Sequence, residues 1–316
     1  MKILVLGFSV TAERPGYVEI ATPELDKRFD AKITKIGLGG LQPYHARYLF
    51  AELVKTHDPD VLVLDHATPA FRNFYKDKDD YRRSLLSTLR ECHIRSVRVV
   101  MIDFPRTDVD YADDWVSALH TELAATLGIP YRRVELVDGI LRDEVHPTEF
   151  GRQHYAEVLI DCVARARRIE VAPGFFAGTP RYGSVRVSDL VDTEGRLTRI
   201  DRGGFVADLV RIAENETLDI PLGQTLSVCG FTALMGPTTG TLKIVAGDLE
   251  RQQVSYDQFC YYERLGAFLF KQAGAAIPCT TVRLTQTDEI PSVPLLKGEK
   301  NTGPRTGAVG HIFTES

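Results

Sequence analysis

The sequence lacks any long apolar run and any dense cluster of basic residues. No segment reaches the ~18 consecutive apolar residues that indicate a membrane-spanning helix. The net charge of −5 and the isoelectric point near 5.9 argue against general nucleic-acid binding, which favours a basic surface. We therefore expect neither a membrane nor a nucleic acid among the partners of this protein.

Cysteine is scarce, and its spacing matches neither a zinc site nor a disulfide framework. Five cysteines at wide spacing suit a reducing compartment: Cys92, Cys162, Cys229, Cys260 and Cys279. The apolar run Ile3–Leu6 is too short for the core of a signal peptide, so we expect a cytoplasmic protein. The sequence also lacks a glycine-rich phosphate loop and a cluster of metal-ligating residues, and we expect no cofactor and no metal.

The length of 316 residues corresponds to about two domains of ~150 residues each. In the first half, short apolar runs predict five strands: Ile3–Leu6, Ala31–Ile36, Val61–Leu64, Val97–Ile102 and Tyr131–Val137. Apolar positions at helical spacing predict four helices: Tyr44–Thr56, Asp79–Cys92, Ala112–Leu127 and Thr148–Ile169. Because each crossover must bury a helix against the sheet, we expect residues 1–170 to form a three-layer α/β/α, flavodoxin-like sandwich with a five-stranded parallel sheet.

The second half has a different pattern. Prolines and glycines between residues 171 and 182 predict a linker, and short alternating runs follow. Eight of these runs are candidate strands: Ser184–Val187, Phe205–Ile212, Thr225–Cys229, Thr241–Val245, Gln253–Tyr256, Ala267–Phe270, Thr280–Leu284 and Ala308–Phe313. Short strands at spacings near ten residues predict a jelly-roll-like β-sandwich over residues 183–316.

The residues with the clearest chemical pattern are a serine and a histidine at two strand ends. Ser9 follows the first predicted strand in Gly7-Phe-Ser9-Val, and Asp143-Glu-Val-His146-Pro follows the fifth. A serine becomes a nucleophile when a base takes its proton, and an imidazole is an effective base when a third group fixes its tautomer. Since ligands bind at the carboxyl edge of such sheets, we expect Ser9, His146 and Asp143 to meet there. The alternative for Ser9 is a serine that caps the next segment.

These motifs resemble those of the SGNH (GDSL-type) hydrolase superfamily over roughly residues 1–168. The family's first block, Gly-Asp-Ser and a small residue, corresponds to Gly7-Phe8-Ser9-Val10, and its last, Asp-x-x-His-Pro, to Asp143–Pro147. A glycine-rich turn after the second strand corresponds to Gly37-Leu-Gly39-Gly40. The resemblance implies Ser9 as nucleophile, His146 as base and Asp143 as its orienting group. It also implies an oxyanion hole formed by the N–H groups of Ser9 and Gly40, although Gly40 is equally expected where a turn needs positive φ.

Two positions depart from the family pattern. Phe8 replaces the aspartate of the first block, and the third block, which usually supplies an asparagine donor to the oxyanion, reads Leu64-Asp65-His66-Ala67-Thr68. The candidates for a replacement donor are His66, Thr68 and Asn73. Losing one such donor typically costs on the order of 10²–10³ in rate.

The resemblance implies a serine esterase that hydrolyses a short O-acyl ester, such as an acetyl ester, with no cofactor. Because accessory β-rich domains often accompany carbohydrate esterases, a saccharide ester is the expected substrate. Two alternatives stay open at this point. One is an O-acyltransferase that passes the same acyl group to a sugar hydroxyl, and the other is a binding protein on a hydrolase scaffold without catalysis. The sequence leaves the oligomeric state open.

Overall fold

The computed structural model describes residues 1–270 and 276–316. The chain divides into two compact units. The first contains Met1–Pro180 and the short segment Arg202–Phe205, and the second contains Arg181–Asp201 and Val206–Ser316. The division after Pro180 falls inside segment 171–182, for which the composition predicts a linker.

The first unit is built on a parallel sheet with the strand order β2-β1-β3-β4-β5. Its strands are β1 (Lys2–Gly7), β2 (Lys32–Gly37), β3 (Val61–Asp65), β4 (Arg98–Asp103) and β5 (Tyr131–Arg133), and the short β6 (Arg167–Arg168) pairs antiparallel with β4. Every residue of β3 is buried, because helices cover both faces of a parallel sheet. This strand order is the flavodoxin-like one, and the predicted α/β fold is confirmed.

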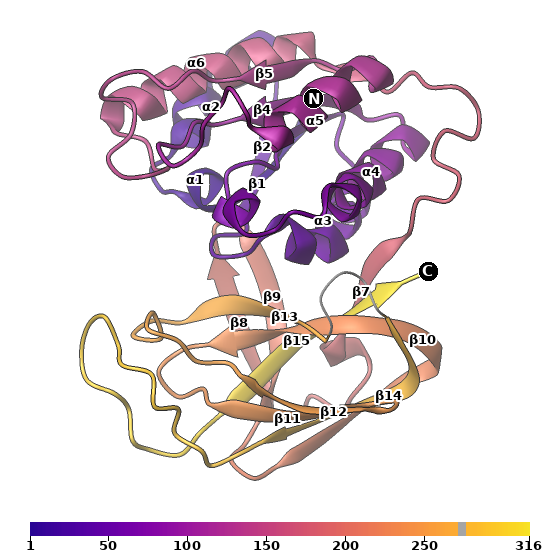
Figure 1. Cartoon of the computed structure of the whole chain (residues 1–316), viewed down its shortest axis with the longest axis vertical. Helices are drawn as coiled ribbons and strands as arrows, with labels where there is room; N and C mark the ends of the chain where they lie inside the picture. Colours follow the sequence, from indigo (N-terminus) through magenta and orange to yellow (C-terminus); the bar gives the residue numbers. More distant parts are fainter. Residues whose placement is uncertain (271–275) are drawn as a thin grey trace. The chain divides into compact units, whose positions relative to one another are not determined.

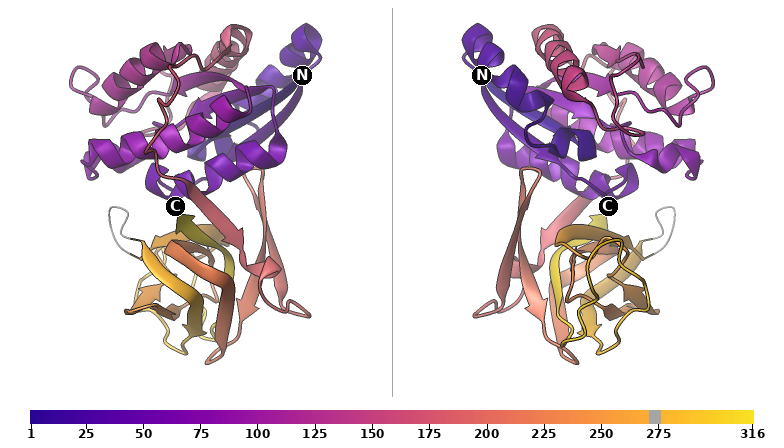
Figure 2. Two further views of the ribbon diagram at one scale, coloured as in Figure 1. Left: turned by 90° about the vertical axis from the view of Figure 1, so that its right-hand side faces the viewer. Right: turned by 90° about the vertical axis from the view of Figure 1, so that its left-hand side faces the viewer.

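Helices cover both faces of this sheet (Figures 1 and 2). The helices are α1 (Ser9–Ala12), α2 (Tyr17–Phe29), α3 (Pro43–His57), α4 (Lys78–Ile94), α5 (Trp115–Leu127) and α6 (Glu149–Arg165), with a 3₁₀ turn η1 (Ala70–Asn73). Helices α2 and α6 pack together on the face to which Ile3 and Val5 of β1 point. Helices α3 and α4 pack against each other, α3 contacts β1 and α5 contacts β4.

Several elements of this unit differ from the sequence-based expectation. The short α1, η1 and β6 have no predicted counterpart, and the helix predicted over Thr148–Ile169 ends at Arg165, before β6. Helix α2 was not predicted, because it buries only four residues, Tyr17, Val18, Ala21 and Leu25, and contains Pro23. Strand β5 ends at Arg133, where the prediction extended to Val137. The start of α6 agrees with the sequence, since the Thr148 hydroxyl caps it by accepting the N–H of Gly151 at 3.1 Å.

The second unit is an antiparallel β-domain of nine strands (Figure 2). They are β7 (Tyr182–Arg186), β8 (Leu197–Arg202), β9 (Phe205–Ile212), β10 (Thr217–Met235), β11 (Thr241–Ala246), β12 (Leu249–Val254), β13 (Arg264–Leu269), β14 (Ile277–Gln286) and β15 (Gly307–Glu315), with a 3₁₀ turn η2 (Val187–Asp189). The central β10 pairs with β13, β14 and β15. An irregularity in its pairing with β14, between Pro221 and Leu226, lets the long strand bend around an apolar core. Of these strands only β8 has no counterpart in the prediction, because its burial alternates weakly.

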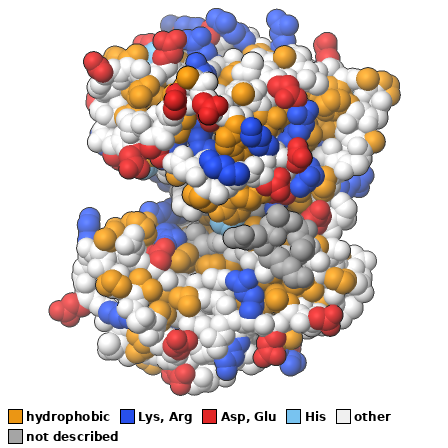
Figure 3. All heavy atoms as spheres, in the orientation of Figure 1, with side chains coloured by type: hydrophobic (Ala, Val, Ile, Leu, Met, Phe, Trp, Pro, Cys, Tyr) orange, Lys and Arg blue, Asp and Glu red, His pale blue; other side chains and the backbone are white. Residues whose placement is uncertain are grey.

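All five cysteines are buried. Over residues 1–270 and 276–316, no helix combines the length and the hydrophobicity that crossing a membrane requires. Within the same ranges, no group of three or more His, Cys, Asp or Glu residues is placed to hold a metal ion. On the face shown in Figure 3, acidic and basic side chains are interspersed on both units.

Candidate active site

The segment that carries Ser9 is fixed by close packing at the end of β1. Phe8 is fully buried, and its ring lies 5.7 Å from the ring of Phe50 and 6.1 Å from that of His66. A Cβ atom on Gly7 would lie 2.2 Å from the Thr11 hydroxyl, so only glycine fits there. Phe8 therefore anchors this loop in the core, and the half-buried Ser9 begins α1.

The glycine-rich turn lies directly beside Ser9. Gly7 and Gly37 are paired in the β1–β2 ladder, and the N–H of Leu38 donates to the Gly7 carbonyl at 2.9 Å. A Cβ atom on Gly39 would lie 3.8 Å from Ser9 Cα. Gly40 has a φ of +85°, and a Cβ there would meet no protein atom within 4 Å. The structural requirement for glycine at residue 40 is thus the positive φ, which was the alternative explanation from the sequence.

His146 and Asp143 form a pair on the loop between β5 and α6. His146 Nδ1 lies 3.0 Å from both carboxylate oxygens of Asp143. Asp143 Oδ1 also accepts the backbone N–H groups of Val145 and His146, at 3.0 and 2.8 Å. Burial raises the pKa of Asp143, but these hydrogen bonds outweigh it and hold that pKa below its ordinary value. The carboxylate therefore fixes the ring with Nδ1 towards Asp143. Within the described ranges, His146 Nε2 has no hydrogen-bond partner.

One contact from this loop and one from α6 reach the segment that follows Ser9. The Arg142 guanidinium pairs with the carboxylate of Glu13, which directly follows α1. Arg142 also donates to the Pro147 carbonyl at 3.0 Å, and Arg152 of α6 donates to the Pro15 carbonyl at 3.3 Å. The Ser9 hydroxyl makes no hydrogen bond to any described residue, so a direct bond between Ser9 and His146 stays a prediction.

The three candidates for a third oxyanion donor all have other hydrogen-bond partners. The Thr68 hydroxyl donates to Asp65 Oδ1 at 2.5 Å, and the Asn73 amide donates to Asp108 at 2.9 Å. His66 is fully buried, and its Nδ1 lies 3.0 Å from the Tyr81 hydroxyl. Burial lowers the pKa of His66 to about 3, so this ring is neutral at physiological pH. Their role at the oxyanion stays a prediction.

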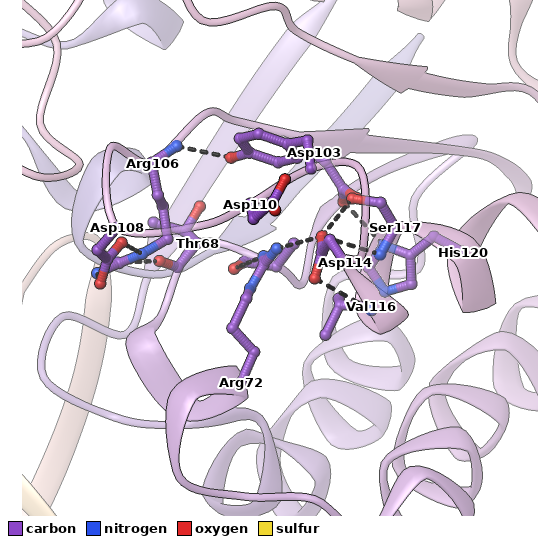
Figure 4. Close-up of polar contacts among 12 residues, drawn as sticks. Thr68, Arg72, Asp103, Arg106, Asp108, Asp110, Asp114, Val116, Ser117 and His120 are labelled. Atoms are coloured by element: carbon purple, nitrogen blue, oxygen red, sulfur yellow. Dashed lines mark hydrogen bonds and ion pairs between the residues drawn. The ribbon is translucent and has the colours of Figure 1, made fainter.

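A second group of Ser, His and Asp side chains, which the sequence analysis missed, lies at the C-terminal end of β4 and the N-terminal half of α5 (Figure 4). His120 Nδ1 is 2.8 Å from Asp103, and its Nε2 is 2.7 Å from the Tyr81 hydroxyl. The Ser117 hydroxyl donates to Asp114 at 2.7 Å. Because both ring nitrogens are occupied and Ser117 faces carboxylates, this group has no base free to take the proton of the serine.

Burial opposes the charged form of Asp103, but the His120 ring and the Tyr131 hydroxyl outweigh it and hold its pKa below the ordinary value. A cavity of about 600 Å³ lies next to this group, among the start of α5 and β5; its lining includes Tyr111, Trp115, Ser117, Tyr131 and Arg133. Ser9, Gly40 and His146 do not line it. This cavity is therefore not the predicted catalytic centre.

The fold of the whole chain is similar to that of a solved two-domain esterase active on acetylated mannans, crystallised with mannopentaose. The TM-score is 0.66 at 13% identity, covering 100% of this chain and 92% of that one. A second structure of a two-domain esterase active on acetylated mannans gives a TM-score of 0.64 at 12% identity, with coverages of 100% and 91%. An acetyl xylan esterase structure covers 52% of this chain and 100% of its own, with a TM-score of 0.45 at 17% identity.

No family model matches the chain, and no curated protein matches its sequence. At identities of 12–13% the full-length likeness establishes the fold. The predicted fold, a flavodoxin-like α/β unit followed by a β-rich unit, is thereby confirmed.

Proposed function

We propose that this protein is a serine ester hydrolase that removes a short acyl group, such as acetyl, from a carbohydrate. The observation that carries the proposal is the pair of His146 and Asp143, in which Asp143 holds Nδ1 and no described residue bonds to Nε2. The ion pair of Arg142 with Glu13 ties this loop to the segment that begins with Ser9. An imidazole that a carboxylate orients, with its other nitrogen left for the proton of the serine, is what nucleophilic catalysis by a serine requires of its base.

In this mechanism Ser9 Oγ attacks the ester carbonyl while His146 Nε2 accepts its proton. The N–H groups of Ser9 and Gly40 stabilise the oxyanion of the tetrahedral intermediate. His146 then donates the proton to the leaving sugar oxygen, and an acyl-serine remains. A water molecule, deprotonated by His146, releases the carboxylic acid and restores Ser9. Asp143 stays ionised and stabilises the imidazolium, in line with its lowered pKa.

The carbohydrate part of the proposal is supported by the two-unit fold. The solved esterase that matches this chain over its full length acts on acetylated mannans. We therefore propose an acetylated saccharide as substrate, and hydrolysis as the reaction.

Labelling with a serine-reactive fluorophosphonate, followed by peptide mapping, tests the nucleophile. We expect one adduct, on Ser9, and none in Ser9→Ala. The substrate is tested by incubating the wild type with acetylated mannan and with de-acetylated mannan plus an activated acetate ester. Free acetate from the first supports hydrolysis, whereas transfer of acetyl groups to the second identifies an acyltransferase. A wild type that is neither labelled nor active on any acetate ester contradicts the proposal.

A further inference from the structure

A buried carboxylate at the end of β3 holds the loop that carries Ser9. Asp65 is 1% exposed, and the Thr11 hydroxyl of α1 donates to its Oδ2 at 3.4 Å. A Cβ atom on Gly7 would lie 2.9 Å from the same oxygen, so the backbone that precedes Ser9 packs directly against this carboxylate. Burial raises the pKa of Asp65 to about 6, so the carboxyl is ionised at neutral pH and can accept the hydrogen bond from Thr11. Asp65 thus contacts residues on both sides of Ser9, in the loop where Phe8 replaces the family's usual aspartate.

The same carboxylate binds a second loop through its other oxygen. Asp65 Oδ1 accepts the N–H and the hydroxyl of Thr68, at 3.2 and 2.5 Å. The carbonyl of Thr68 in turn accepts from the guanidinium of Arg106 at 2.7 Å (Figure 4). Arg106 is only 4% exposed, and Asp108 holds its guanidinium with two hydrogen bonds of 2.7 and 2.8 Å. The loop after β3 and the loop after β4 are therefore joined by a buried, charge-assisted contact.

The loop after β4 extends this connection to the histidine. The N–H of Thr107, next to Arg106, donates to the carbonyl of Glu144 at 3.0 Å. Glu144 lies between Asp143 and His146 in the sequence. A continuous path of hydrogen bonds and single residues therefore leads from the Ser9 loop through Asp65, Thr68 and Arg106 to the His146 loop.

We propose that Asp65 and Arg106 are positioning residues that set the distance between the nucleophile loop and the base loop. The inference rests on the proposed function, because it takes Ser9 and His146 as nucleophile and base. Neither Asp65 nor Arg106 contacts the reacting atoms; each fixes backbone that carries them. Reaction rates depend steeply on such geometry, and a displacement of 1 Å can cost about 10²-fold in rate.

The test compares Arg106→Lys and Asp65→Asn with a matched control, Arg72→Lys. Lysine retains the charge but loses the planar guanidinium that reaches Thr68 and Asp108 together. Asparagine places an amide N–H₂ group where Asp65 accepts hydrogen bonds from Thr11 or Thr68. Arg72 is equally buried at 4% exposure and pairs with Asp114 at 2.5 Å and with the Ala67 carbonyl at 2.5 Å. Its hydrogen bonds to described residues reach neither the Ser9 loop nor the His146 loop. The control therefore loses a buried arginine pair, while the hydrogen bonds that Asp65, Thr68 and Arg106 make to one another stay in place.

The measurements are kcat and KM on a small activated acetate ester at pH 7.5, the rate of fluorophosphonate labelling, and the melting temperature. For Arg106→Lys and Asp65→Asn we expect kcat and the labelling rate to fall about 10–100-fold, with KM within about threefold of the wild type. For Arg72→Lys we expect a lower melting temperature and a kcat within about threefold of the wild type.

The proposal is overturned if folded Arg106→Lys and Asp65→Asn have the same kcat as folded Arg72→Lys. In that case, labelling of the wild type on Ser9 still supports the proposed function. An unlabelled and inactive wild type overturns both. If the two variants do not fold, Thr11→Val serves as a second test, because it removes a single hydroxyl, which hydrogen-bonds to Asp65 and Tyr17. Its kcat should then fall at least about threefold, and an unchanged kcat overturns the proposal.

Discussion

The first unit contains two histidine–aspartate pairs, one at the end of β4 and one on the loop between β5 and α6, and they differ in whether a ring nitrogen is available. In the pair of His120 and Asp103, the ring is fully buried, and both of its nitrogens have partners, Asp103 and the Tyr81 hydroxyl. In the pair of His146 and Asp143, the imidazole side chain is 30% exposed, and in the part of the chain that the structure describes only Nδ1 has a partner. Since a general base must offer a free nitrogen to its substrate, only the second pair suits catalysis. The two pairs have the same components, and their surroundings determine the difference.

The largest expected effect comes from removing the members of the exposed pair and the serine. Because the nucleophile and base act as a unit, Ser9→Ala, His146→Ala and the double variant should all lose about 10⁴-fold or more in kcat, by similar amounts. Steady-state kinetics on an activated acetate ester measures this loss, with circular dichroism to verify folding. A double variant whose loss is the product of the two single losses would argue against a shared catalytic step.

The second effect concerns the buried pair and appears in stability. His120→Phe leaves the Asp103 carboxylate in the core without its imidazole partner, and breaking such a pair typically costs about 3–5 kcal/mol. Urea unfolding should show this loss, while kcat of the folded protein stays within a few-fold of the wild type. His146→Phe is the matched control and should change the free energy of unfolding by about 0.5 kcal/mol or less. Equal destabilisation by both substitutions would remove the distinction between the pairs.

The sequence predicted the exposed pair and missed the buried one, for a physical reason. Asp143 and His146 are three residues apart, so their contact is local and appears as a motif. Asp103 and His120 are separated by 17 residues, and they meet only because α5 packs against β4. The available signal was Asp103 directly after an apolar strand run, together with a histidine on the following helix. Such a signal specifies a contact only when the packing of the helix is known.

The same limit explains which parts of the fold were predictable. Strands β1 and β3 are buried on both faces, so their apolar runs identify them without any tertiary information. Helix α2 buries one narrow stripe among charged residues and contains Pro23, and its signal was too weak. The path from Asp65 through Arg106 to the base loop depends on loop contacts between distant residues, which no local pattern encodes.

The third effect tests what the carboxylate adds to the exposed pair. Asp143→Asn keeps the shape of the side chain, but the amide can stabilise the wrong tautomer of His146 and no longer offsets the imidazolium charge. We expect kcat to fall about 10²-fold, less than for Ser9→Ala, because Asp143 is half-exposed and water solvates part of the charge. Asp161→Asn on the outer side of α6, where Asp161 pairs with exposed Arg165, is the control and should be neutral. A kcat of Asp143→Asn close to that of the wild type would mean that the carboxylate is not the orienting group.

The smallest effect is a dependence of stability on pH that comes from buried histidines. Burial lowers the pKa of both His45 and His66 to about 3, whereas an unfolded histidine titrates near 6.5. Below pH 6.5 the unfolded chain therefore binds more protons than the folded one, and the free energy of unfolding falls as the pH falls. Each histidine contributes about 1.4 kcal/mol per pH unit, and this stability is fully present only above pH 6.5.

Asp65 acts in the opposite direction, because burial raises its pKa from 3.8 to about 6. The folded state binds this proton more tightly than the unfolded state, so Asp65 increases the free energy of unfolding as the pH falls from 6 towards 3.8. This increase cancels about the decrease that one buried histidine causes over the same range. Urea unfolding between pH 4.5 and 6 should therefore give a flatter slope for His66→Phe than for the wild type, and a steeper slope for Asp65→Asn. The slope of each variant should differ from that of the wild type by about 1.4 kcal/mol per pH unit. A change of the same sign in both variants would contradict the opposite pKa shifts of His66 and Asp65. The buried histidine and the buried aspartate would then not titrate as their surroundings require.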